Sequence, residues 1–541
     1  MGLSLNAEQK EILKIFKIEE QYVVPAYQRP YSWGYDQCVQ LYNDITEAYS
    51  LGEDYFIGNI IIAKSDSNKD ILEIIDGQQR LITLLLFLKT LSIYQPELNV
   101  LKQILEQEDW EGNEKKPRIT SDIFEANDGS DLMSVLQYDS QKFNLRLEEC
   151  TDKKGVIIER KCRNKFERNI LYFYSWLKFF SIKNDLKKFI SYLLKNIYLL
   201  PIELTGKTQE EANEKALIIF ETINNRGMNL EDADIFKAKL YKKAKKVNEE
   251  NIFIDLWVTF KYNCEELHLE IDDVFRYYSH IIRGKEGITT SEINLREFFT
   301  RESVSPFEVK KYKEILDDLF KIIEILNFIK KEKHNNFGEL TKWIQLVEAY
   351  TNQYPKFAVV TYLYENGMGI KNNPKLIIFL KSLIRYIYHL GSTTRVKFEI
   401  YSVIKQVFKK LEIKEYFVEA THSDFDYLGR LKYGYALLYF YLNNNETLSN
   451  YSVDRIISLR DIESLTNQQS EWDDIVDSIG NFIVLDIPKK NTLFSKKREY
   501  YSTSKIAEVR AIFARELTLK DFTNRNDVIK NKLIDFFAGK I

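Results

Sequence analysis

The sequence predicts an α+β fold that is predominantly helical, and two stretches of the chain indicate it. Residues 71–75 form an apolar, β-branched run that stops at Asp76-Gly77, and a Leu-rich run follows at 81–88. That change of pattern is typical of a strand, a tight turn and a helix. From about residue 246 to 415, in contrast, one amphipathic helical pattern follows another. With 20 glycines and 9 prolines in 541 residues, compact helical packing is favoured over long flexible linkers.

The length of the chain predicts about three domains, because one hydrophobic core rarely serves 541 residues. We expect boundaries that give domains at 1–245, 246–415 and 416–541, with a helical insertion at about 95–190 in the first. The net charge of −3 argues against a uniformly basic nucleic-acid binder but leaves room for a local basic groove.

Cysteine and histidine usage gives no metal signature. The four cysteines are widely spread without a C-x-x-C pair, which favours neither a zinc site nor a disulfide framework and fits a reducing cytosol. Four of the five histidines lie between 246 and 415 without metal-ligand spacing, so we expect core or surface roles. No signal-peptide core or membrane-length apolar run is found, and a cytoplasmic protein without membrane contact is expected.

The first ninety residues alternate between helical and strand patterns around a small sheet. The expected elements are a helix at 6–16, a strand at 22–24, a helix at 35–50, and strands at 55–63 and 71–75. A further strand at 197–204 and a helix at about 208–222 complete the predicted N-terminal domain. The turn after residue 75 lies at the carboxyl end of a strand, where open α/β sheets place their ligands.

The turn itself carries polar groups suited to an anion. Asp76 can cap the following helix, and Gly77 allows another backbone or a ligand to come close. Free N–H groups of the first helical turn, together with Gln78, Gln79 and Arg80, predict a phosphate site. The simpler interpretation is a capped turn whose arginine pairs with a surface carboxylate.

Two more polar segments are suited to a nucleotide. Gln28, Arg29, Tyr31 and Trp33 can stack on a base and hold a phosphate, unless the two aromatic residues belong to the core. Further along the chain, a polar corner and the helix after it can grip a nucleotide, or form only a solvated turn: Asn224, Arg226, Gly227, Asp234 and Lys237. In the tail, the basic run 496–498 suits either a phosphate backbone or a solvated helix.

Four motifs occur in one order: Pro25-x-Tyr27-Gln28-Arg29-x-Tyr31-x-Trp33, then Tyr55-Phe56-Ile57-Gly58, then Asp76-Gly77-Gln78-Gln79-Arg80-Leu81, then Phe220-Glu221-x-x-Asn224-x-Arg226-Gly227 with Asp234. Their order and spacing resemble the ParB-like domain of GmrSD-type restriction enzymes and SspE-type phage-defence proteins. The tail resembles the HNH-like domain of that family through Ile479-Gly480-Asn481, Asn491 and Lys496. The resemblance implies a ParB-like α/β domain, a helical middle and a ββα-metal-like C-terminal domain.

In that family the ParB-like domain binds and hydrolyses a nucleoside triphosphate and senses modified DNA, and the C-terminal domain cleaves or nicks DNA. A nucleoside triphosphate with Mg²⁺ or another divalent cation is therefore the implied cofactor. By position, the implied hydrolysis group is Asp76, Gln78, Gln79 and Arg80. The implied nucleotide-binding residues are Gln28, Arg29, Tyr31, Trp33, Gly77, Asn224, Arg226, Asp234 and Lys237.

The tail departs from the family at the residue that matters most for cleavage. The family carries Glu-His-Ile, whereas this chain has Asp454-Arg455-Ile456 and no histidine after His422. An arginine cannot act as a general base at neutral pH, because its pKa exceeds about 12. Asp454 remains a candidate metal ligand. The degenerate nuclease set is Asp454, Arg455, Asn481, Asn491 and Lys496.

Three functional hypotheses follow. The first is a nucleotide-binding and nucleotide-hydrolysing anti-phage restriction protein that acts on DNA, including modified phage DNA, with an inactive or atypical nuclease domain. The second is an active metal-dependent nickase or endonuclease of the type IV restriction kind. The third is a non-enzymatic, nucleotide-gated scaffold that binds DNA or protein. A partner protein from a defence operon and self-association fit all three.

Overall fold

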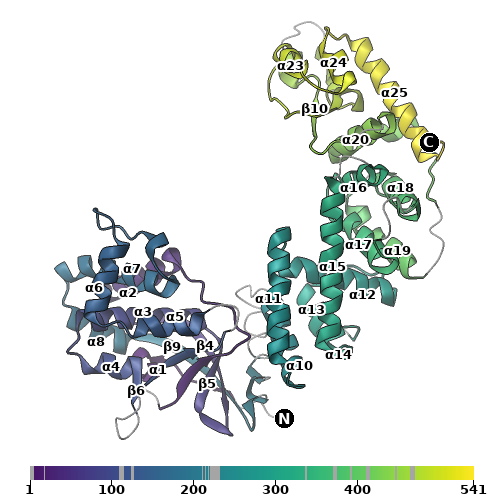
Figure 1. Ribbon diagram of the computed structural model, residues 1–541. Helices are drawn as coiled ribbons and strands as arrows, with labels where there is room; N and C mark the ends of the chain where they lie inside the picture. The colour runs from purple at the N-terminus through teal and green to yellow at the C-terminus, as the bar shows by residue number, and fades with distance from the viewer. Residues whose placement is uncertain are drawn as a thin grey trace. The chain divides into compact units, whose positions relative to one another are not determined.

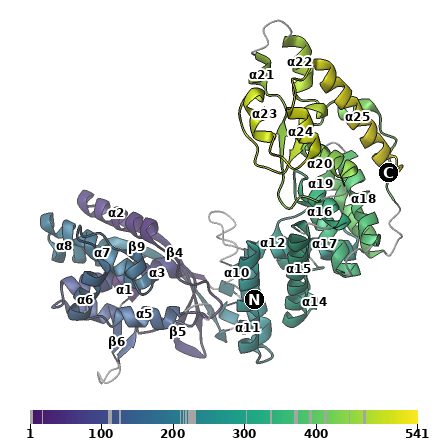
Figure 2. The same ribbon diagram turned by 45° about the horizontal axis from the view of Figure 1, so that its top comes forward.

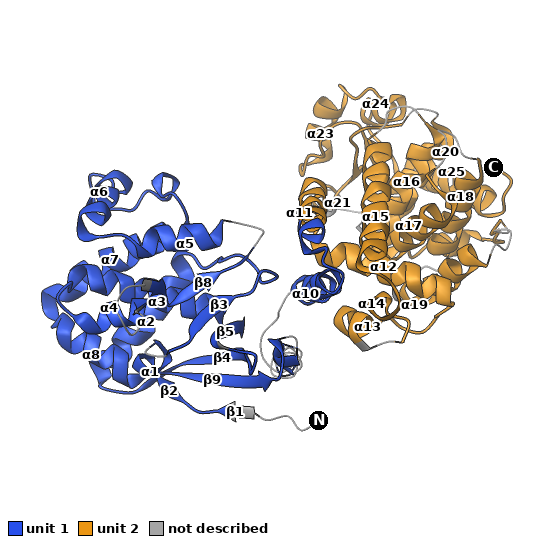
Figure 3. Ribbon diagram, turned by 60° about the horizontal axis from the view of Figure 1, so that its bottom comes forward, with its two compact units in different colours: residues 1–254 blue, residues 255–541 orange. Residues whose placement is uncertain are grey.

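The computed structural model describes residues 5–16, 19–108, 115–123, 127–209, 211–213, 215–216, 219, 232–301, 303–334, 338–368, 374–389, 393–409, 415–444, 447–463 and 469–541. The chain divides into two compact units, residues 1–254 and 255–541 (Figure 3). A predominantly helical α+β fold is confirmed, because the strands gather mainly in one mixed sheet of unit 1 and helices make up most of the rest (Figure 1).

Seven strands of the described residues form the sheet of unit 1. They are β1 (Leu5–Ala7), β2 (Lys10–Glu11), β3 (Gln21–Val24), β4 (Tyr55–Ser65), β5 (Asn68–Asp76), β8 (Ile119–Ser121) and β9 (Ile197–Gly206). Their order is β1-β9-β4-β5-β3-β8, with β2 also paired to β9. β3 is parallel to β5 and β8, and β4 is parallel to β9, whereas β4 and β5 run antiparallel.

The main core of unit 1 lies on one face of this sheet. Alternate residues such as Ile60, Ile62 and Ile74 face it from the strands. Helix α3 (Gln78–Tyr94) is buried along nearly its whole length, as expected for a helix that is apolar on all sides. The other helices of the unit are α1 (Ile12–Phe16), α2 (Tyr35–Leu51), α4 (Asn99–Leu105), α5 (Asp128–Leu136), α6 (Ser140–Cys150), α7 (Lys165–Lys183), α8 (Leu186–Asn196) and α10 (Asp232–Lys245).

The opposite face of the sheet carries a smaller apolar cluster. Ile61, Ile75 and Leu204 pack there against Ala212 and Ala216. Among the described residues of the helix expected at 208–222, positions 209, 211–213, 215, 216 and 219 are helical. A second, two-stranded sheet of unit 1 pairs β6 (Glu106–Glu108) with β7 (Lys115–Pro117).

The helix predicted at 6–16 is wrong in its first half. Residues 5–7 and 10–11 are strands that pair with β9, and only residues 12–16 are helical. The edge of β9 offers these residues hydrogen bonds that a short isolated helix cannot match. The predicted strands at 55–63 and 71–75 and the helix at 35–50 are confirmed as β4, β5 and α2.

Unit 2 is built mainly from helices. They are α11 (Glu250–Leu267, which begins in unit 1), α12 (Ile271–Glu286), α13 (Leu295–Arg301), α14 (Pro306–Val309), α15 (Tyr312–Lys333), α16 (Glu339–Glu348), α17 (Tyr354–Asn366), α18 (Pro374–His389), α19 (Thr393–Phe408), α20 (Lys432–Asn443), α21 (Leu459–Glu463), α22 (Gln469–Val476), α23 (Phe494–Tyr501), α24 (Ala507–Phe513) and α25 (Leu519–Phe537). Strands β10 (Ser452–Arg455) and β11 (Phe482–Leu485) form an antiparallel pair.

Unit 2 joins the two regions that the sequence suggests as separate domains at 246–415 and 416–541. Contacts between α25 and the middle helices explain this. Arg385 of α18 donates from Nε to the carbonyl oxygen of Phe536 at 2.8 Å, and Trp343 of α16 stacks on the Phe536 ring. Helix α25 also packs against α20 and α22 (Figure 2).

Candidate functional site

Two segments that the sequence singles out emerge from the same edge of the sheet. Because β3 and β5 are parallel neighbours, residues 25–34 and the turn at 76–80 both follow strand ends at that edge. β4 runs antiparallel to β5, so its first residues reach the edge as well. The topology therefore gathers three of the four motifs at one place.

Two β-bulges shape this edge. In the pairing of β4 with β5, Ile61 lies opposite Asp76 and Ile62 opposite Ile74, which leaves Ile75 as an extra residue. The side-chain amide of Gln28 donates from Nε2 to the carbonyl oxygen of Ile75 at 3.0 Å. A bulge redirects the residues beside it, and here it stands directly before Asp76.

The second bulge lies in the pairing of β4 with β9, where Ile57 is the extra residue and Gly58 has a φ of +137°. A Cβ at Gly58 would collide with Nη1 of Arg80, so the guanidinium group lies directly over this glycine. The sequence motif includes Gly58, but sequence reasoning did not place it in the site. Only the strand register shows that it makes room for Arg80.

Gly77 is the N-cap residue of α3, with a φ of +87°. A Cβ there would lie 2.6 Å from Cγ2 of Ile60, which explains the need for glycine. Asp76 is not the N-cap residue expected from the sequence: it ends β5, and Gly77, which has no side chain, takes the N-cap position. The N–H groups of the first turn are therefore left to other acceptors.

Asp76 and Arg80 form a loose ion pair, with Oδ2 and Nη2 3.7 Å apart. Burial raises the pKa of the Asp76 carboxyl, and the positive charges of Arg80 and Arg29 and the Gly77 N–H oppose this rise. Arg29 is exposed, and the side chain of Arg80 is 22% exposed. Two guanidinium groups thus lie close to the open end of α3.

The two glutamines of the turn point inward and hold the loop after β3. Gln78 donates from Nε2 to the Arg29 carbonyl at 3.0 Å, and Gln79 donates to the Pro30 carbonyl at 3.2 Å. Oε1 of Gln79 accepts from the backbone N–H groups of Ser32 and Trp33 at 2.8 and 3.3 Å. All of the polar atoms of Gln79 are thereby engaged, which makes it a positioning residue.

Gln78, unlike Gln79, has one polar atom that is not engaged in a hydrogen bond within the described part of the chain. Its side chain is 5% exposed, and its Oε1 has no hydrogen-bond partner among the described residues. A buried oxygen without a partner is costly in a folded protein, so this acceptor is a candidate contact for a ligand or a bound water.

Tyr31 lies behind the site rather than in it. It is 1% exposed and stacks on Phe166, with ring centroids 4.9 Å apart. Its hydroxyl group lies 2.7 Å from Oγ1 of Thr83 and accepts from Nδ2 of Asn169 at 3.0 Å. In this structure it cannot stack on a nucleotide, which corrects the role inferred from the sequence. Trp33 is half-buried and packs against the same core.

Helix α10 supplies one more of the expected residues. Lys237 is 2% exposed and donates from Nζ to the Gln28 carbonyl oxygen at 3.3 Å. It therefore supports the loop after β3. Asp234 lies in the first turn of the same helix. Asn224, Arg226 and Gly227 lie outside the described residues.

In unit 2, β10 and β11 pair antiparallel, α21 and α22 lie between them in the chain, and α23 follows β11. Lys497 of α23, which is 3% exposed in its side chain, places Nζ 2.9 Å from Oδ2 of Asp454. Tyr501 donates its hydroxyl group to the same carboxyl oxygen at 2.8 Å. Asp454 thus already has a cationic partner. The residue predicted from the sequence was Lys496, which is exposed; Lys497, the next residue, contacts Asp454 instead.

The other residues of the expected nuclease set have structural or exposed positions. Asn481 is fully buried; its amide accepts from the N–H of Ile457 and donates to the carbonyl groups of Ile457 and Val476. Arg455 donates from Nη2 to Asp477 at 2.7 Å. Asn491 is exposed. The structure therefore brings Asp454 together with Lys497 and Tyr501.

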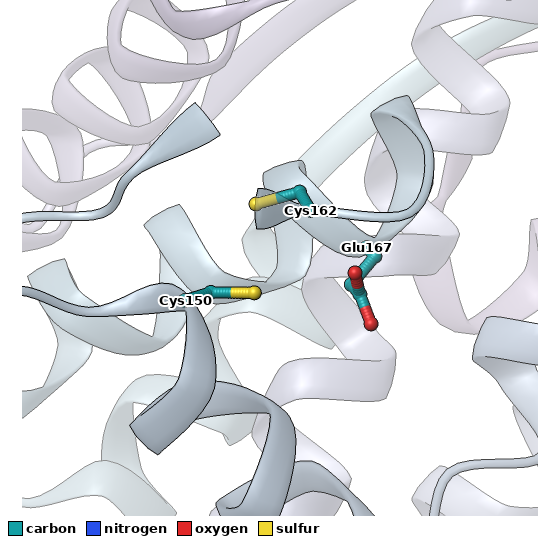
Figure 4. Close-up of side chains that lie close together, drawn as sticks. All are labelled: Cys150, Cys162 and Glu167. Atoms are coloured by element: carbon teal, nitrogen blue, oxygen red, sulfur yellow. The ribbon is translucent and has the colours of Figure 1, made fainter. Parts of the chain in front are cut away.

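In the described part of the chain, one group of three side chains has the spacing of a metal site: Cys150, Cys162 and Glu167, with ligand atoms within 4.8 Å (Figure 4). Glu167 is already bound by Nε of Arg146 at 2.7 Å and by the Tyr138 hydroxyl at 2.7 Å. A buried guanidinium group at this position disfavours a second cation. We assign the cluster to the structure of unit 1.

Comparison with known families bears on unit 1. Residues 12–241 match the GmrSD restriction endonuclease N-terminal domain. The GmrSD match includes the loop after β3, the turn at 76–80 and the first ten residues of α10. It supports a GmrSD-type restriction protein and lies entirely within unit 1. No curated protein matches the chain. None of the described helices has the length and apolar character needed to span a membrane.

Proposed function

We propose that unit 1 binds and hydrolyses a nucleoside triphosphate at the turn 76–80, within a restriction-type defence protein that acts on DNA. The observation that carries the proposal is the open N-terminus of α3 beside Arg29 and Arg80. Free N–H groups and two guanidinium groups provide the donors that a polyphosphate requires.

Each residue of the turn then has a distinct role. Arg80, seated over Gly58, contacts phosphate oxygens and neutralises the charge that develops on them during hydrolysis. Oε1 of Gln78 accepts a hydrogen bond from the attacking water or from the ligand. Gln79 and Lys237 position the loop that carries Arg29.

A divalent cation fits this arrangement through Asp76. Mg²⁺ usually binds one or two carboxylates together with phosphate oxygens and water. The Asp76 side chain is 29% exposed and only loosely paired with Arg80, so its carboxylate can serve as one such ligand. The cation would withdraw charge from the phosphate groups, while Arg80 and α3 fix their position.

For unit 2 we propose a DNA- or protein-binding role without cleavage. The observation that favours it over an active nickase is the buried ammonium group of Lys497 against Asp454. A lysine in this position competes with a metal ion for the carboxylate. The modified-DNA preference and a partner protein of a defence operon belong to the same proposal and follow from the resemblance of the sequence motifs described above.

The proposal is tested by phosphate release from ATP, GTP, CTP and UTP with Mg²⁺, with and without DNA. We expect turnover of at least one triphosphate by the wild type and its loss in Arg80→Ala. Arg160→Ala is the matched control, because Arg160 is exposed in unit 1 away from the turn. Unchanged turnover in folded Arg80→Ala would refute the assignment. Nucleotide binding without turnover in the wild type would favour the scaffold hypothesis.

A further inference from the structure

A cavity of about 450 Å³ lies in unit 1 at the end of α3 that is remote from the turn 76–80. It is bounded by the last turns of α3, by α4, by the β6–β7 pair and by the junction of α5 and α6. Eleven residues separate Gln78 from Lys89, which corresponds to about 16 Å along the helix axis. The cavity is therefore distinct from the site proposed above.

Lysines dominate the charged groups of this cavity. Lys89, Lys102 and Lys116 contribute to its lining, against Glu106 and Asp139. Lys89 makes no ion pair with a described residue, and burial lowers the pKa of its ammonium group, opposed by Glu106 and Asp139. A partly buried cation without a direct partner is stabilised when an anion enters beside it.

The first turn of α6 contributes to the same cavity. Ser140, the first residue of α6, lines the cavity, so the N-terminal end of an 11-residue helix lies beside the lysines. Asp139 caps the helix by accepting from the N–H of Lys142 at 2.7 Å. The Asp139 carboxylate thus occupies the N-terminus of α6, and the hydroxyl group of Ser140 adds a hydrogen-bond donor to the lining.

The remaining lining suits an organic body rather than a free ion. Aliphatic side chains and two prolines form much of the wall, and Gln95 and Gln137 add amide groups. Such a wall can cover the faces of a planar ring, while amides bond its polar edge. A volume of about 450 Å³ lies within the usual range for small-molecule sites.

We propose that this cavity is a second ligand site of unit 1, which binds a phosphate ester of mononucleotide size. The phosphate group lies against Lys89, Lys102 and Ser140, and the organic part lies between the aliphatic walls near Gln95 and Gln137. This site works independently of the triphosphate site at the other end of α3.

The test uses AMP as the ligand and the full chain carrying Arg80→Ala, so that binding at the turn 76–80 does not contribute. Isothermal titration should show AMP binding in this background, with inorganic phosphate as a competitor and adenosine as a much weaker ligand. Lys89→Gln should weaken AMP binding by about tenfold or more, because it removes a charge-assisted hydrogen bond. Lys178→Gln, on the exposed face of α7, is the matched control.

Gln137→Glu provides a second variant, and the protein should fold as the wild type does, because residue 137 is exposed and lines the cavity. The added negative charge should weaken AMP binding while the thermal unfolding temperature stays unchanged. The proposal is overturned if folded Arg80→Ala protein does not bind AMP at millimolar concentration. It is also overturned if adenosine binds as tightly as AMP, or if both cavity variants bind like the control.

Discussion

Gly58 and Arg80 illustrate how one backbone position can determine the place of a functional side chain. Gly58 combines a φ of +137° with a guanidinium group lying where its Cβ would be. The arginine keeps its place only because no side chain competes for it. We therefore expect the proposed triphosphate hydrolysis to depend on glycine at position 58.

Gly58→Ala should abolish most triphosphate turnover while the protein stays folded, because the methyl group displaces the Arg80 guanidinium. Gly52→Ala is the control: its φ is +71°, but a Cβ there would meet no atom within 4 Å. Each substitution should cost about 1 kcal/mol through its positive φ. Phosphate release and thermal unfolding of both variants separate the two effects. Equal turnover in both would contradict the role given to Gly58.

Asp76 gives a prediction about pH. Its pKa is raised in the folded protein, mainly by burial, so the folded state binds a proton more readily than the unfolded state. The ionised carboxylate therefore lowers stability above the unfolded pKa of about 3.9, and stability is lost as the pH rises through the folded pKa.

Asp76→Asn should accordingly be as stable as the wild type or more stable at neutral pH, with the difference vanishing in acid. Its triphosphate turnover should be lost if Asp76 holds the divalent cation. Urea unfolding at pH 4 and pH 7 measures the first effect, and phosphate release measures the second. Lower stability of Asp76→Asn at pH 7 would show that the Arg80 pair outweighs burial.

At the scale of elements, the loop after β3 is held by α3 through side-chain amides. Gln79 alone bonds to three backbone groups of residues 30–33. Behind this loop, Tyr31 connects α3 to α7 through Thr83 and Asn169. The conformation of the loop is therefore fixed by two helices that differ widely in sequence position.

Gln79→Ala should destabilise unit 1 by about 2 kcal/mol, since it leaves several buried backbone groups without partners. It should also reduce triphosphate affinity, because Arg29 lies on the same loop. Denaturant unfolding and nucleotide titration give the two values. Gln40→Ala, at an exposed position of α2, is a suitable control. If Gln79→Ala changed the stability as little as the control does, the role given to Gln79 in holding the loop after β3 would be refuted.

Sequence reasoning located the turn 76–80 because its signals are local: a β-branched run, an Asp-Gly break and a Leu-rich run. It could not place Tyr31, whose burial depends on Phe166 and Asn169 more than 130 residues away. The strands at residues 5–7 and 10–11 could not be predicted for the same reason, since they depend on pairing with the distant strand β9. The choice between Lys496 and Lys497 depends on the rotation of α23, which composition does not reveal.

At the scale of the whole molecule, two compact units carry different polar centres. Unit 1 contains the turn 76–80, and unit 2 contains the Asp454–Lys497 pair. Each unit has its own core, so damage to one centre is expected to leave the chemistry of the other unchanged.

Lys497→Met should destabilise unit 2 by about 3 kcal/mol, because it leaves Asp454 largely buried without its cation. Triphosphate turnover by unit 1 should not change. Plasmid nicking with Mg²⁺ or Mn²⁺ should be absent in the wild type and in Asp454→Asn. Metal-dependent nicking that disappears in Asp454→Asn would instead establish unit 2 as a nuclease.

The bulge at Ile75 makes the site sensitive to residue count as well as residue identity. Removing the one extra residue would restore the regular ladder between β4 and β5 and draw the turn at 76–80 back by one residue relative to the loop after β3. Gln28 would then lose the Ile75 carbonyl group to which it donates, and with it one hydrogen bond between the loop after β3 and the end of β5. A relative that lacks one residue at this position would keep every residue of the four motifs and still lose the geometry of the site.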